Sequence, residues 1–236
     1  MVQMKKILEN FVTSRYKPFS QKAFSNQSFT TGIFGYFFLL GFILLSIWAD
    51  GAGEVASNYL RTLRMPLILM IVFNIIGLTL FNITKLKKYA VVISYLSGVL
   101  FLFFIGAFLT AFTDNPLHYN IYGSIFIFIG WIIGVMLHVI IVNISLKQGS
   151  MKIRDKYGDY YVNILGGIGL TCMFYYTFSD KDFFLLIGIA LTIIGLLVVL
   201  TFNFPRILPY WRKEQPRRDI SVYSDSIKLM KRGKSK

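Results

Sequence analysis

The sequence predicts an all-α protein, a polytopic integral membrane helix bundle of about six transmembrane helices with both ends in the cytoplasm. Three observations support this prediction. Hydrophobic residues make up 55% of the 236 residues, and charged residues only 15%. The charges gather in clusters between long apolar runs, and a helix needs ~20 apolar residues to cross ~30 Å of hydrocarbon. Lysine and arginine also fall mainly in alternate segments between the runs.

Hydropathy places six spans along the chain, and none of them contains a charged residue. The fifth is the weakest, because Asn163, Thr171 and three glycines dilute its apolar side chains. The predicted boundaries carry a few residues of error. The spans lie at about Thr31–Trp48, Met65–Phe81, Tyr89–Phe112, Tyr119–Leu146, Tyr161–Phe178 and Phe183–Phe204.

The positive charges predict the orientation of these spans. Of the 25 lysines and arginines, 22 lie before span one, between spans two and three, between spans four and five, or after span six. Positive charge stays on the cytoplasmic side during insertion. We therefore expect a protein integral to the membrane, in a bacterial plasma membrane, with both termini cytoplasmic.

The chain divides into a basic N-terminal segment (1–30), a six-helix transmembrane domain (31–204) and a basic, largely disordered cytoplasmic tail (205–236). Residues 4–15 place apolar side chains on one helical face, which favours a short helix lying on the inner leaflet. Residues 55–63 repeat that pattern after a glycine-rich turn. Both segments are alternatively ordinary flexible connectors.

No catalytic, cofactor-binding or metal-binding residues emerge from the sequence. All eleven acidic residues lie in loops or in the tail. The sequence contains no helical zinc-binding pattern and no Ser–His pair that could act as nucleophile and base. The single cysteine, Cys172, cannot form a disulfide within one chain. We therefore expect no enzyme activity and no cofactor.

His138 is the most suggestive residue, because an imidazole inside an apolar span needs a hydrogen-bond partner. Gly123, Gly130, Gly134 and His138 share one helical face, and the spacing of Gly130 and Gly134 is typical of close helix contacts. This pattern favours helix packing with one interhelical hydrogen bond. A proton-coupled or ligand-contacting role for His138 is the alternative.

Asparagine side chains near the span ends suggest a second polar feature. Asn163, beside three glycines, could line an inward-facing cavity together with other asparagines, although asparagine is equally common at helix ends. Asn74 lies in the middle of span two. Asn74 and His138 are the clear intramembrane polar groups, and they could together mark a midplane site.

The C-terminal tail is strongly basic and is expected to meet anionic lipid headgroups or an acidic partner protein. Each cationic side chain near an anionic leaflet contributes ~1 kcal/mol of attraction. Topology signalling explains most of this charge, and nucleic acid is not required as a partner. The candidate contact residues are Arg212, Lys213, Arg217, Arg218, Lys231 and Arg232.

Three classes of function remain. The first is a non-enzymatic helix bundle that binds the bilayer and other membrane proteins, or itself, as an accessory, interaction or immunity-type protein. The second is a small transporter or channel with a polar site near Asn74 and His138. The third is a membrane enzyme that uses loop acids such as Asp155 and Asp159. The absence of charged or proline-broken spans ranks them in this order.

Overall fold

The computed structural model describes residues 2–20, 24–48, 54–179 and 181–211, and these parts are helical with short turns. No strand occurs within them, so the all-α prediction is confirmed for the described chain. The longer helices are α3 (Asn26–Trp48), α5 (Arg64–Asn82), α6 (Lys87–Thr110), α7 (Pro116–Lys147), α8 (Lys152–Ser179) and α9 (Asp182–Asn203). The shorter ones are α1 (Val2–Glu9), α2 (Lys17–Ser20), α4 (Glu54–Thr62) and α10 (Leu208–Trp211), with 3-10 turns at Thr84–Leu86 and Phe204–Arg206.

Five helical segments of the described chain are long and apolar enough to cross a membrane. They contain α3, α5, α6, α7 and α9, which match five of the predicted spans. The predicted fifth span lies in α8, and α8 is not one of the five. A charged first half and several polar or glycine residues lower its hydropathy. The count of six spans and the orientation therefore stay predictions.

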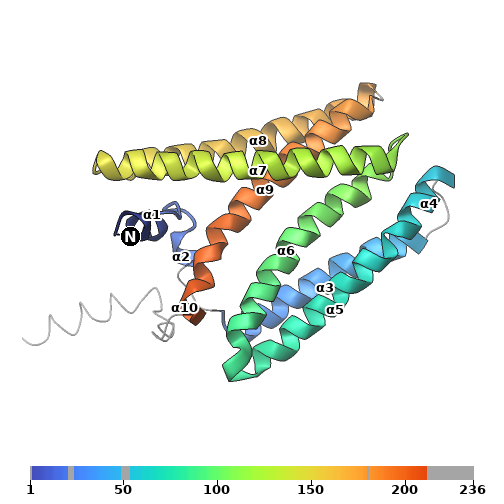
Figure 1. The fold of residues 1–236 in the computed structure, drawn as a ribbon. Helices are drawn as coiled ribbons and strands as arrows, with labels where there is room; N and C mark the ends of the chain where they lie inside the picture. Colours follow the sequence, from blue (N-terminus) through green and yellow to red (C-terminus); the bar gives the residue numbers. More distant parts are fainter. Residues whose placement is uncertain (1, 21–23, 49–53, 180, 212–236) are drawn as a thin grey trace, which may run out of the picture.

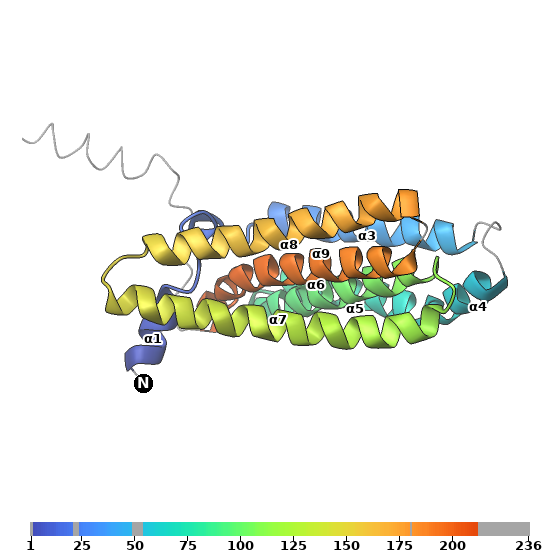
Figure 2. The same cartoon turned by 90° about the horizontal axis from the view of Figure 1, so that it is seen from above.

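The long helices form an elongated bundle. Figure 1 shows α7 and α8 side by side, with α9 and α6 between this pair and the pair of α3 and α5. Figure 2 shows α1 and the turn between α7 and α8 at one end of the bundle, and α4 at the other. The chain thus passes back and forth between two ends, as a membrane bundle requires.

The helices pack through apolar side chains and, at some crossings, through glycine. Leu40 of α3, Leu67 of α5 and Phe101 of α6 are buried in one cluster at the α4 half of the bundle. The α8–α9 crossing is the closest. A Cβ on Gly169 would lie 2.9 Å from the backbone oxygen of Gly188, so only glycine allows the two backbones to approach so closely.

Both predicted short amphipathic helices form, and the N-terminal one is shorter than predicted. The N-terminal helix ends at Glu9, earlier than the predicted residue 15, and the residues after it turn back into the bundle. Helix α4 forms as predicted from its spacing. Its Tyr59 is buried and donates a hydrogen bond to the Ala107 backbone oxygen of α6, at 3.0 Å. Both segments therefore pack against the helices rather than only along a lipid surface.

Candidate functional site

The N-terminal strap, defined as residues 10–16, closes the end of the bundle formed by α7, α8 and α9. Phe11, Val12 and Thr13 are all buried. Phe11 and Val12 pack in one cluster with Val198 and Phe202 of α9. The strap follows a short helix whose last backbone hydrogen bonds are donated by the Asn10 and Phe11 amides, and its backbone then runs across the helix ends. It joins three helices that are distant from it in sequence.

His138 of α7 is held by this strap. Its Nε2 lies 2.6 Å from the Phe11 backbone oxygen, and the ring is buried. A carbonyl oxygen only accepts hydrogen bonds, so Nε2 carries a proton and donates a hydrogen bond to the Phe11 oxygen. The Phe11 and Phe202 rings meet the imidazole edge-on, with centroid distances of 4.9 and 5.0 Å. His138 therefore has the single hydrogen bond predicted for it, but to the strap and not to another helix.

Arg154, in the first turn of α8, fixes the strap from a second direction. Its side chain is 2% exposed, and its Nη1 donates to the Asn10 backbone oxygen at 3.0 Å. Its Nη2 donates to the Ser14 hydroxyl at 3.1 Å, and its Nε to the Asp155 carboxylate at 2.9 Å. Asp155 in turn accepts hydrogen bonds from the Ser14 amide and hydroxyl, at 2.9 and 2.6 Å. We call Asn10, Ser14, Arg154 and Asp155 the strap lock.

The strap lock keeps its carboxylate ionised. Partial burial raises the pKa of Asp155, but the hydrogen bonds from Ser14 and the neighbouring Arg154 guanidinium together lower it by more. The pKa of Asp155 therefore lies below its ordinary value of 3.8. At neutral pH the lock contains one buried cation and one anion that faces it, so its charges are matched.

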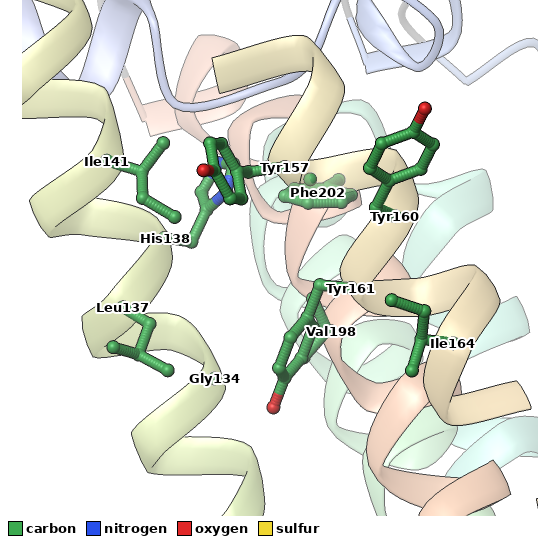
Figure 3. A pocket seen from close by; sticks show the side chains of 11 residues that line it. Gly134, Leu137, His138, Ile141, Tyr157, Tyr160, Tyr161, Ile164, Val198 and Phe202 are labelled. Atoms are coloured by element: carbon green, nitrogen blue, oxygen red, sulfur yellow. The ribbon is translucent and has the colours of Figure 1, made fainter. Parts of the chain in front are cut away.

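Next to His138, a cavity of about 290 Å³ lies between α7, α8 and α9. Its floor is formed by buried side chains, among them His138 and Phe202, and its rim by the half-exposed Tyr160 and Ile164 of α8. Figure 3 shows Tyr161 extending from α8 into the space between the helices, with its hydroxyl near Gly134. The walls are almost entirely apolar. Such a cavity suits an apolar ligand rather than a charged or sugar-like one.

The outer face of α8, defined as Asn163, Gly167, Leu170 and Phe174, points away from the rest of the bundle. All four residues are exposed, Leu170 by 63% and Phe174 by 66%. A Cβ on Gly167 would meet nothing within 4 Å. No described residue forms a hydrogen bond with the Asn163 side chain. The face therefore combines a free amide, a small residue and two large apolar side chains.

The predicted glycine face of α7 is divided among different neighbours. A Cβ on Gly130 would approach Ile194 of α9 at 2.5 Å, and one on Gly134 would approach the Tyr161 hydroxyl of α8 at 2.7 Å. A Cβ on Gly123 would meet nothing within 4 Å. Gly130 and Gly134 thus allow α9 and α8 to pack closely, whereas Gly123 does not contribute to either contact.

Asn74 and His138 do not share a site. The Asn74 amide donates to the Met70 backbone oxygen and to the Ser97 hydroxyl of α6, both at 2.8 Å. Its side-chain oxygen is buried without a hydrogen-bond partner among the described residues. Asn74 does not line the cavity beside His138. The structure thus shows an α5–α6 contact at Asn74 and a separate strap contact at His138.

The structure also bears on the predicted tail contacts and on metal binding. The candidate tail residues Arg212, Lys213, Arg217, Arg218, Lys231 and Arg232 lie outside the described residues. Within the described chain, no three His, Cys, Asp or Glu side chains gather closely enough to hold a metal ion. The strap lock was missed, because a cation just before an apolar run is normally solvated. Its partners lie about 140 positions away in sequence, and no local pattern joins them.

Comparison with protein-family models, with curated proteins and with solved structures finds no match to this chain.

Proposed function

We propose that the chain is a non-enzymatic multi-pass membrane protein that acts by binding another integral membrane protein. It serves either as an accessory subunit of a membrane assembly or as an immunity-type protector against a membrane-active toxin. The outer face of α8 is the observation that supports this proposal. It offers a docking surface for a helix of the partner, within the apolar half of α8.

The spacing and chemistry of the outer face suit a helix better than lipid. Asn163, Gly167, Leu170 and Phe174 are separated by four, three and four positions, which is the spacing of a helix–helix seam. Lipid tails cannot satisfy the Asn163 amide, whereas a partner helix can. Gly167 lets a second backbone approach, and the two large side chains fill the space on either side of it.

The same proposal places the protein in a bacterial plasma membrane with both ends in the cytoplasm, because the positive charges favour that side. The basic tail would then lie beside anionic headgroups of the inner leaflet. In this position it could add electrostatic attraction to a complex whose specificity comes from α8. Self-association through α8 is a special case of the same mechanism.

A small transporter ranks second, and the cavity beside His138 is the observation in its favour. It ranks lower because Asn74 and His138 have separate partners, so they do not form one polar pathway. A membrane enzyme ranks third. Asp155, one of its candidate acids, is engaged by Arg154 and Ser14 and is therefore not free to exchange protons with a substrate.

Site-specific photo-crosslinking in native membranes tests the proposal. A photoreactive residue at position 170 should give a discrete product with one integral membrane protein. The control is the same residue at Ile140, an exposed apolar position of α7. A product of about twice the chain mass of 27.1 kDa would identify a second copy as the partner. Equal, diffuse products from both positions would contradict the proposal.

A pair of glycine variants checks that the contact is made through the outer face. Gly167→Leu should abolish the crosslink from position 170, because the added side chain would hold the partner helix away. Gly35→Leu on α3 is the matched control, since a Cβ there also meets nothing within 4 Å. Both variants should fold, so a loss with Gly167→Leu alone would locate the partner on α8.

A further inference from the structure

The cavity between α7, α8 and α9 continues into a graded stripe of exposed residues along α8. We call Lys152, Lys156, Tyr160 and Ile164 the α8 stripe. They follow one another at intervals of four, so they lie along one side of the helix over about 18 Å. The stripe begins with two exposed cations, continues with a phenol and ends with an aliphatic side chain. Tyr160 and Ile164 also form the rim of the cavity.

This order of chemistry matches that of an anionic lipid. The Lys156 ammonium lies 5.8 Å from the centre of the Tyr160 ring, which places a cation at the entrance of the cavity. Phenol rings favour the boundary between headgroups and acyl chains. Beyond Tyr160 the walls are apolar. A headgroup, a glycerol region and an acyl chain would therefore meet a cation, an aromatic ring and an apolar cavity in turn.

We propose that the cavity binds one acyl chain of an anionic phospholipid from the surrounding bilayer, with its headgroup at Lys152 and Lys156. The cavity volume of about 290 Å³ is roughly twice the ~150 Å³ that is enough for benzene. This volume accommodates part of a single chain. The site goes beyond the partner-binding function and does not depend on it, because the partner would use the outer face of α8.

The polar groups nearby do not oppose this ligand. The Nε2–H of His138, on the cavity floor, is already used by the Phe11 backbone oxygen, so the floor does not present it to a ligand. The Asp155 carboxylate is matched by Arg154 and therefore leaves the two lysines free to attract an anion. Asp159, the other acid in this part of α8, has one carboxylate oxygen buried without a hydrogen-bond partner among the described residues, and its charge offsets only one of the two lysines. A net positive charge remains at the entrance.

A photoreactive lipid tests the proposal. The full chain is reconstituted in phosphatidylcholine vesicles with a trace of phosphatidylglycerol that carries a diazirine in its acyl chain. Labelled residues are then mapped by mass spectrometry. The exposed cavity residues Tyr157, Tyr160 and Ile164 should be labelled more strongly than the similarly exposed Ile125 and Ile129 on α7. Unlabelled phosphatidylglycerol should remove this excess, and additional phosphatidylcholine should not. Uniform labelling around the bundle would overturn the proposal.

Two variants connect the labelling to the cavity and to the charge. Ile164→Trp fills the entrance and should lower cavity labelling to the level of the other lipid-facing residues. Ile168→Trp is its control, since Ile168 is similarly exposed one turn away and does not line the cavity. Lys156→Gln should reduce the preference for phosphatidylglycerol about fivefold, the effect of one cation beside an anionic headgroup. Lys85→Gln, in another basic turn, should leave it unchanged.

The source of the ligand is distinguished by competition with a soluble amphiphile. Sodium dodecanoate, added to the vesicles below the level that disrupts them, should not displace the labelled lipid from the cavity. Displacement by dodecanoate but not by phosphatidylglycerol would overturn the lipid assignment and indicate a cavity for soluble fatty acids. A result in which Ile164→Trp and Ile168→Trp behave alike would show that the labelling does not come from the cavity.

Discussion

Replacing Arg154 by methionine should release the N-terminal strap while the helices stay folded. The guanidinium is 2% exposed and donates hydrogen bonds to Asn10, Ser14 and Asp155. Removing one partner of a buried ion pair costs ~3–5 kcal/mol, because the other groups are left unpaired. The Asp155 side chain is 28% exposed, so water recovers part of this loss. We therefore expect the free energy of strap opening to fall by ~2–3 kcal/mol.

Limited proteolysis of the purified chain in mild detergent measures this change. Arg15 is an exposed trypsin site within the strap, because the residue that follows it is Tyr16. When opening and closing are fast, cleavage follows the population of the open strap. A loss of ~2–3 kcal/mol should raise the initial cleavage rate after Arg15 by about 30- to 150-fold, at ~1.4 kcal/mol for each factor of ten.

The neighbouring Lys156→Met variant is the control, since the Lys156 side chain is exposed and lies near the Tyr160 ring, outside the hydrogen bonds of the strap lock. It should leave cleavage after Arg15 within about twofold of the unchanged chain, as expected for a surface substitution. Equal cleavage of the Arg154→Met and Lys156→Met variants would refute the argument. It would mean that apolar contacts of Phe11 hold the strap without the lock.

Three further predictions concern pH and packing. Because the pKa of Asp155 is lower in the folded chain, its contribution to strap docking is present above its ordinary value of 3.8 and is lost as pH falls through the lowered value. A fluorophore on the strap should thus report docking at neutral pH and release only below about pH 4, and Asp155→Asn should abolish this transition. Gly169→Ala should destabilise the α8–α9 crossing by ~1–3 kcal/mol, because the added methyl group overpacks it. Thermal unfolding would detect this as a fall in melting temperature of ~2–4 °C per kcal/mol. An equal fall for Gly167→Ala would contradict the close crossing. Ser97→Ala should cost ~0.6–1.7 kcal/mol by breaking its bond to Asn74, and in an equilibrium unfolding assay its effect should nearly disappear in an Asn74→Leu background.

The helices were predictable where the apolar residues of one segment set its structure. All six apolar runs lie in long helices, and five of these are apolar enough to cross a membrane. A run of about 20 apolar residues in lipid leaves the backbone groups no partner outside their own helix. Helix α4 followed from the spacing of Tyr59 and its neighbours. The N-terminal helix ended early because Phe11 and Val12 gained more from burial beside α9 than from continuing an amphipathic face. The spacing of apolar residues along the sequence does not show which surface of the protein will bury them.

The candidate sites were less predictable than the helices. The sequence singled out His138 for a buried hydrogen bond, since an imidazole in an apolar run needs a partner. It did not identify Phe11 as that partner, or Arg154 as the buried cation, because their contacts join residues more than 120 positions apart. The cavity also escaped prediction. A void depends on how three helices fit together, and apart from His138 and Gly134 the residues that line it look like ordinary helix packing in the sequence.

The sequence by itself determined the all-helical class, the position of the apolar segments and the uneven distribution of positive charge. These properties follow from each segment's own length and composition, because lipid and water act on every residue directly. Only the tertiary structure decided that the N-terminal strap locks onto α7 and α8, that Asn74 and His138 belong to different contacts, and that α8 keeps an open outer face. Such pairings depend on the relative rotation and spacing of helices, which long-range packing sets and no local pattern records.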